Sequence, residues 1–102
     1  MSTDAGSKGE IEALWNKFRP LPFGYSGSDN ELRFELTSID TFAVGCIESF
    51  IERRGHQDAK QLSVLKGCVA DLEPLLGGLH GEAKRYFDQL LRLSKLVLDS
   101  NS

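Results

Sequence analysis

The histidines and cysteines are the side chains of this chain best suited to catalysis or metal binding, and their spacing argues against both roles. His56 and His80 flank a predicted helix of ~20 residues, which separates them by roughly 30 Å. Neither has the i, i+4 partner of a zinc-binding helix. Cys46 and Cys68 fall inside predicted helices, away from the helix N-termini and from both histidines, so nothing is expected to activate their thiols. We therefore expect two buried, unreactive thiols and no catalytic residue.

The carboxylates and glycines do not form a cofactor or metal motif either. Glu48 and Glu52 lie one helical turn apart, but the chain has no E-x-x-H pair of the kind that di-metal helical bundles use. The segment 77–81 precedes a predicted helix, yet it lacks the lysine and serine of a phosphate-binding loop. The sequence therefore predicts no cofactor and no metal ion.

Charge points instead to a protein partner. Residues 1–55 carry nine acidic and six basic side chains, whereas residues 56–102 carry six of each. Between Asp29 and Glu52 the only base among six acids is Arg33. Such a segment repels phosphate backbones and attracts basic proteins. The basic residues near the C-terminus are offset by neighbouring acids, and the net charge is −3, so we expect no nucleic-acid binding.

An exposed aromatic ring beside a group of carboxylates is a typical hot spot for a protein partner. One group of aromatic residues lies near or within the acidic segment, and we expect most of its members to be buried in the core: Trp15, Phe18, Phe23, Tyr25 and Phe34. The predicted partner-binding residues comprise two aromatic anchors and the carboxylates that surround them: Trp15, Tyr25, Asp29, Glu31, Glu35, Glu48 and Glu52.

The apolar periodicity predicts a mainly α-helical fold. Ile39, Phe42, Ala43 and later residues at helical spacing form the core stripe of a helix over about 38–54, with Ser38 as its N-cap. Further apolar stripes predict helices over about 58–76 and 81–98, the first of which Pro74 kinks or ends. These three helices form an antiparallel core, and a short helix over about 9–18 packs on one side.

Two segments alternate between apolar and polar residues and predict a small β-hairpin, with strands over about 21–25 and 31–36. Residues 1–8 and 99–102 read as flexible tails, so a single helical domain spans 9–98. No apolar run is long enough to span a bilayer, and the first nine residues do not resemble a signal peptide, which together predict a cytoplasmic protein without membrane contact.

These observations favour a non-enzymatic protein–protein interaction module. Its most specific form is a cytoplasmic inhibitor of the immunity or antitoxin type, which binds a basic toxin or enzyme through an acidic and aromatic surface. One alternative is a homo-oligomeric structural or regulatory protein, for example a homodimer that buries the excess leucines of segment 81–98. A second alternative is a small-molecule sensor or enzyme with a pocket between the helices and the hairpin.

Overall fold

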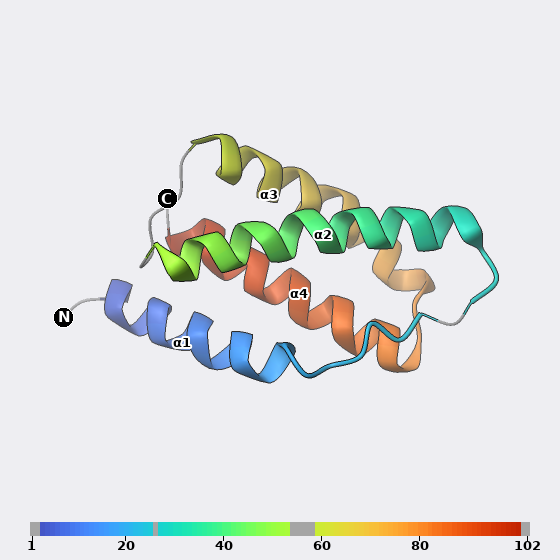
Figure 1. Ribbon diagram of the computed structural model, residues 1–102, viewed down its shortest axis with the longest axis horizontal. Coiled ribbons are helices and arrows are strands. Elements are labelled where there is room, and N and C mark those ends of the chain that lie inside the picture. Colours follow the sequence, from blue (N-terminus) through green and yellow to red (C-terminus); the bar gives the residue numbers. More distant parts are fainter. Residues whose placement is uncertain (1–2, 26, 54–58, 101–102) are drawn as a thin grey trace.

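The computed structural model of the chain is a helical bundle, shown in Figure 1. It describes residues 3–25, 27–53 and 59–100. Four α-helices follow one another in this part of the chain, namely α1 (Thr3–Phe18), α2 (Asn30–Glu52), α3 (Ala59–Leu72) and α4 (Gly81–Ser100), with a 3₁₀ helix η1 (Glu73–Gly78) before the last. Successive α-helices run in alternating directions. The mainly helical prediction is confirmed.

Helix α4 is the centre of the bundle, because it packs against α1, α2 and α3. Its sequence explains this position, since apolar side chains recur at helical spacing along almost its whole length. The α4 residues that are buried in the core are Ala83, Tyr86, Phe87, Leu90, Leu93, Ser94 and Val97. The extra leucines of this helix (Leu91, Leu96 and Leu98) pack partly buried against the same core.

The predicted β-hairpin is wrong, because no described residue lies in a strand. Residues 31–36 form the first turns of α2 instead, and Asp29 rather than Ser38 is the N-cap, with the Leu32 amide donating to its Oδ1 at 3.0 Å. Leu36 is fully buried whereas Phe34 is 74% exposed, so two residues of the apparent strand face point to different sides of a helix. Leu32, Leu36 and Ile39 share the i, i+4, i+7 spacing that packs onto the core.

The other helix boundaries lie within a few residues of the prediction, except at the start of α1. Helix α1 begins at Thr3, six residues before the expected start, and α4 continues to Ser100. The α-helical part of α3 ends at Leu72, and the 3₁₀ helix η1 begins at Glu73, one residue before Pro74, whose ring disfavours a continued α-helix. His56, which the sequence places before this helix, lies outside the described residues, as do its neighbours Gly55 and Asp58.

The loop between α1 and α2 crosses the N-terminal end of α4. Gly24 adopts a φ of +75° there, and a β-carbon at this position would lie 2.7 Å from the Glu82 Cβ and 2.8 Å from the Ala83 nitrogen. Only glycine allows both the left-handed backbone and this close approach. The loop is therefore held against α4 and fixes where α2 begins. None of the helices in the described ranges is long and apolar enough to cross a membrane.

Replacing Leu90 by alanine should lower the free energy of unfolding by about 2–5 kcal/mol, because the side chain is fully buried in the centre of the bundle. Phe34→Ala is the matched control, since this ring lies largely in solvent and its loss should change stability by less than about 0.5 kcal/mol. Urea denaturation followed by circular dichroism measures both. Equal destabilisation by the two variants would contradict the assignment of core and surface.

Candidate functional site

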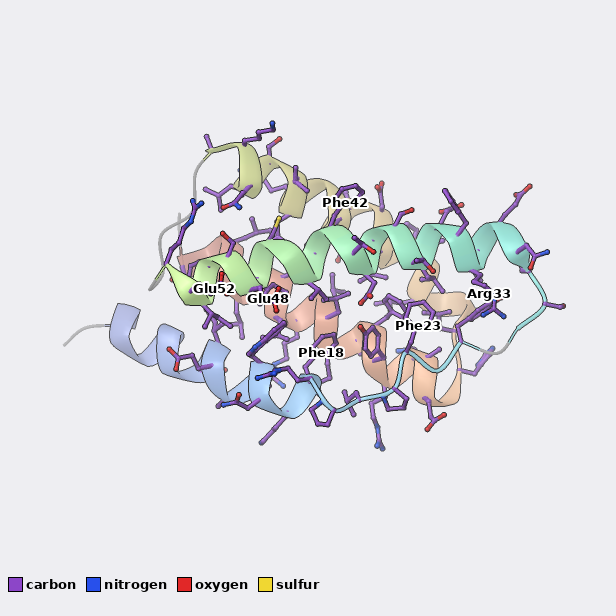
Figure 2. The ribbon with its side chains drawn as sticks, in the orientation of Figure 1. Phe18, Phe23, Arg33, Phe42, Glu48 and Glu52 are labelled. Atoms are coloured by element: carbon purple, nitrogen blue, oxygen red, sulfur yellow. The ribbon has the colours of Figure 1, made fainter. Side chains whose placement is uncertain are left out.

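The clearest candidate for a binding site is the outer face of α2, defined here as Glu31, Phe34, Glu35, Ser38 and Phe42. Phe34, Ser38 and Phe42 follow at i, i+4 and i+8 and therefore share one side of the helix. Phe34 is 74% exposed and Phe42 is 59% exposed, which makes them the most exposed large hydrophobic residues in the described chain. The sequence placed Phe42 in the core stripe, and this prediction is wrong. Figure 2 shows Phe42 on the side of α2 that faces α3.

Phe34 lies between two shallow hollows of the surface. The first has a volume of about 380 Å³ and is lined by Asn30, Glu31, Phe34 and Glu35. The second has a volume of about 250 Å³ and extends toward α3, where its lining residues are Phe34, Glu35, Ser38, Ile39 and Asp71. Each hollow thus combines the aromatic ring with carboxylates, and neither is lined by a lysine or arginine of the described residues.

The single base of the acidic segment does not neutralise these carboxylates. The Arg33 guanidinium turns back onto the loop before α2, where Nη2 donates to the Gly27 carbonyl oxygen at 2.9 Å and Nη1 to that of Tyr25 at 3.4 Å. It also lies 5.2 Å from the centroid of the Tyr25 ring, within range of a cation–π interaction. Glu31 and Glu35 form no ion pair within the described ranges. The outer face of α2 therefore keeps its negative charge.

The predicted aromatic anchors are less accessible than the exposed phenylalanines. Trp15 is only 8% exposed and stacks on Phe18, with ring centroids 5.9 Å apart. Tyr25 is partly buried against the core and lies beside Arg33. Asp29 is exposed but serves as the N-cap of α2. None of these observations tests partner binding, which stays a prediction for the three residues.

The predicted carboxylates do not form one compact group. Glu31 and Glu35 lie in the first turns of α2, whereas Glu48 and Glu52 lie near its C-terminal end, all four exposed. Thirteen residues of helix between Glu35 and Glu48 correspond to ~20 Å. Asp71 of α3, which the sequence did not suggest, is the carboxylate that the fold adds to the hollow beside Phe34.

A second polar feature joins α2 to α4. The Tyr86 hydroxyl donates a hydrogen bond to Asp40 Oδ1, across 46 positions of sequence. Burial raises the pKa of the Asp40 carboxyl above its ordinary 3.8, although the hydrogen bond from Tyr86 partly offsets this effect. Burial and the neighbouring Asp40 also raise the pKa of the Tyr86 phenol. Tyr86 packs among Phe18, Phe23 and Phe87, and Asp40 is half-buried, so the hydrogen bond links α2 to α4 at the edge of the core.

The residues considered first for chemistry do not converge. Both cysteines are buried, the Cys46 thiol donates to the Gln61 carbonyl oxygen at 3.6 Å, and burial, with Cys46 and Asp71, raises the pKa of Cys68 to about 11. His80 is exposed and lines a hollow of about 280 Å³, three of whose seven lining residues are glycines. Within 3–25, 27–53 and 59–100, no three histidine, cysteine or carboxylate side chains group as a metal site would require.

Sequence reasoning missed Phe34 and Phe42 as binding candidates because both match an apolar pattern. A weak signal was available, since α2 carries more apolar residues than one stripe needs, and Phe34 and Phe42 repeat at i, i+8 out of phase with Leu36, Ala43 and Phe50. Asp71 gave no signal, because only the packing of α3 brings it near α2.

The chain matches no family model, and comparisons with curated proteins and with solved structures found no match either.

The Asp40–Tyr86 pair predicts a pH dependence of stability. Because the pKa of Tyr86 is higher in the folded chain than the ordinary value of 10, the unfolded chain loses this proton first as the pH rises. The free energy of unfolding should then fall as the pH rises above about 10. Tyr86→Phe should show a smaller fall, because the variant lacks the contribution of the Tyr86 phenol. Denaturation at about pH 9 and about pH 11 measures the difference between parent and variant.

Tyr25→Phe provides the control, since it leaves Tyr86 as the only tyrosine and keeps the pH effect. In that background the absorbance change of phenol ionisation should appear above the pH expected for a free tyrosine. Two results together would show that the Asp40–Tyr86 pair does not form. The phenol of Tyr86 would ionise near pH 10, and the free energy of unfolding would depend on pH in the same way in the parent and in Tyr86→Phe.

Proposed function

We propose that this chain is a non-enzymatic protein-binding module that recognises a basic protein through the outer face of α2. The observation that carries the proposal is the exposure of Phe34 and Phe42 on one face of a helix. Full burial of a phenylalanine side chain contributes about 1.5–3 kcal/mol of favourable free energy. The isolated chain does not gain this full contribution at Phe34 or Phe42, because both rings are exposed. A partner that covers the rings recovers it, which is how aromatic hot spots contribute to binding.

Charge supports a basic partner. Glu31, Glu35 and Asp71 surround Phe34, and the nearest base of α2 is held by the loop. Uncompensated carboxylates at the rim of an apolar patch speed the encounter with a positively charged protein and lose this effect as salt rises. In this proposal Phe34 and Phe42 are the anchors, and Trp15 contributes by supporting the core behind α2.

The more specific form of the proposal is a cytoplasmic inhibitor of the immunity or antitoxin type, bound to a basic toxin or enzyme. Small size, acidic balance and an exposed aromatic and acidic face suit a protein that blocks a basic active site. Tyr25, Asp29, Glu48 and Glu52 then belong to the periphery of the interface, where they act by long-range attraction.

Two other functions have weaker support. A homo-oligomer that pairs the outer face of α2 with itself would bring carboxylates of both copies together, which disfavours it. The leucine-rich surface of α4 considered for this role is largely used inside the bundle. A small-molecule sensor or enzyme would use the hollow beside His80, but three of its seven lining residues are glycines, which offer no side chain for recognition.

Charge reversal tests the proposal. We expect Glu31→Lys with Glu35→Lys to slow association with the captured basic partner by at least about tenfold at low salt, with a smaller effect at high salt. The measurement is surface plasmon resonance, with the partner obtained by affinity capture from native lysate and identified by mass spectrometry. Both side chains are exposed, so circular dichroism should show an unchanged fold.

Glu10→Lys with Glu12→Lys is the matched control, because it changes the net charge by the same four units at two exposed carboxylates of α1. The proposal predicts a much smaller change in the association rate for this variant. Equal slowing by the control, or full binding by the double reversal, would contradict the role of the outer face of α2. A chain that sediments as a dimer and captures only itself would favour the homo-oligomer.

A further inference from the structure

The exposed apolar side chains of α2 continue onto α3. Two contacts set the register of these antiparallel helices: Gln61 Nε2 donates to Ser49 Oγ at 3.1 Å, and Ile39 and Asp71 line the same hollow. Phe42 and Val64, which is itself 38% exposed, fall between these two points. The apolar surface therefore runs along the α2–α3 seam, from the hollow at Asn30 to the Ser49–Gln61 hydrogen bond.

The length of this surface suits a helical segment. Fifteen residues of α2 separate Phe34 from Ser49, which corresponds to ~22 Å, the length of a helix of about four turns. The two hollows on either side of Phe34 lie about one turn apart along α2. The second is lined on α2 by Phe34, Glu35, Ser38 and Ile39, each four residues after one of the residues that line the first (Asn30, Glu31, Phe34 and Glu35). Apolar side chains at i and i+4 of a docked helix have the same separation.

Two glycines flank this surface. Gly45 follows Phe42 by three residues on α2, and Gly67 follows Val64 by three residues on α3, both exposed. A β-carbon at either position would meet nothing within 4 Å, so packing inside the chain does not require glycine. Glycine is unfavourable in a helix interior relative to alanine. Because Gly45 and Gly67 have no side chains, the backbone of another molecule has room to approach the seam.

We propose that the α2–α3 seam is the receptor groove for one basic amphipathic helix of the partner protein. This inference rests on the proposed function and specifies the form in which the partner binds. Apolar residues of the helix, spaced at i, i+4 and i+7, fill the hollows beside Phe34 and cover Phe42 and Val64. Lysine or arginine residues at the edges of the helix meet Glu31, Glu35 and Asp71.

Charge and backbone geometry select this occupant. A second copy of the chain would add its own Glu31, Glu35 and Asp71 to a seam already rimmed by carboxylates. An extended strand would need an unpaired sheet edge to receive its backbone hydrogen bonds, and the described residues contain no strand. A helix satisfies its own backbone and presents only side chains, which is what a groove between two helices recognises.

Two synthetic peptides with equal numbers of leucine and lysine residues test the inference. In the first, leucines are spaced three and four apart, so that the peptide is amphipathic as a helix. In the second, leucine and lysine alternate, so that it is amphipathic as a strand. Titration into the ¹⁵N-labelled chain should give saturable shifts with the first peptide at the amides of Phe34, Phe42, Gly45, Val64 and Gly67. The second peptide should bind at least about tenfold more weakly.

Gly45→Leu and Gly67→Leu are the decisive variants. Each should leave the fold intact or stabilise it, because the space is open and leucine is the better helix former, and each should weaken binding of the helical peptide at least about tenfold. Gly9→Leu is the matched control, since Gly9 is an exposed glycine of α1 with equally open surroundings, and its binding should equal that of the parent.

The outcomes separate the two proposals. One outcome would be that both peptides bind equally, that salt abolishes the shifts at Glu31 and Glu35, and that neither glycine variant changes binding. This outcome would contradict the helix receptor and would still support attraction of basic partners by the outer face of α2. If the helical peptide shifts only residues of α1 or α4, the seam is also the wrong site. If neither peptide binds at low salt, both the helix receptor and the attraction for basic partners fail. If the helical peptide binds the parent chain and Gly45→Leu and Gly67→Leu weaken this binding, both the proposed function and the helix receptor are supported.

Discussion

The burial of α4 is the constraint on which the rest of the structure depends. Its apolar residues cover more of the helix circumference than one neighbour can shield, and α1, α2 and α3 each bury part of it. Tyr86 of α4 contacts two of these helices. The centroid of its ring lies 4.6 Å from that of Phe18 in α1, and its hydroxyl donates a hydrogen bond to Asp40 of α2. Each of the other α-helices covers a different side of α4, and α2 and α3 also pack directly against each other.

This arrangement explains why α2 has a free face. With 23 residues it is the longest helix, and it presents one side to α4 and α3 through Leu36, Ile39, Ala43, Cys46, Ile47 and Phe50. Nothing in the described chain covers Phe34 on the opposite side, and Phe42 stays exposed at the edge of α2 that faces α3. The loop before α2 adds to the asymmetry, because it withdraws Arg33 from the helix surface and leaves the carboxylates uncompensated. An apolar and acidic surface is thus a consequence of how the core is filled.

Much of the helical content could be predicted from the sequence, whereas the start of α2 could not. Long apolar stripes identify α3 and α4 because a period of 3.6 sustained over several turns has no competing interpretation. Segment 31–36 is only six residues long, and Leu32, Phe34 and Leu36 satisfy a period of two as well as they satisfy a helix. Asp29 was an available N-cap, but its selection over Ser38 depends on packing Leu32 and Leu36 against a core that the local sequence does not contain.

The sequence by itself determined the mainly helical fold, the break at Pro74, the burial of both cysteines and the acidic balance of segment 29–52. Each follows from local periodicity, backbone chemistry or charge, which do not require a partner in space. Tertiary structure alone decided which aromatic rings are buried, that Asp40 meets Tyr86, and that Asp71 lies beside Phe34. These features depend on the rotation and register of one helix against another, and distant side chains set both when they fill a shared core.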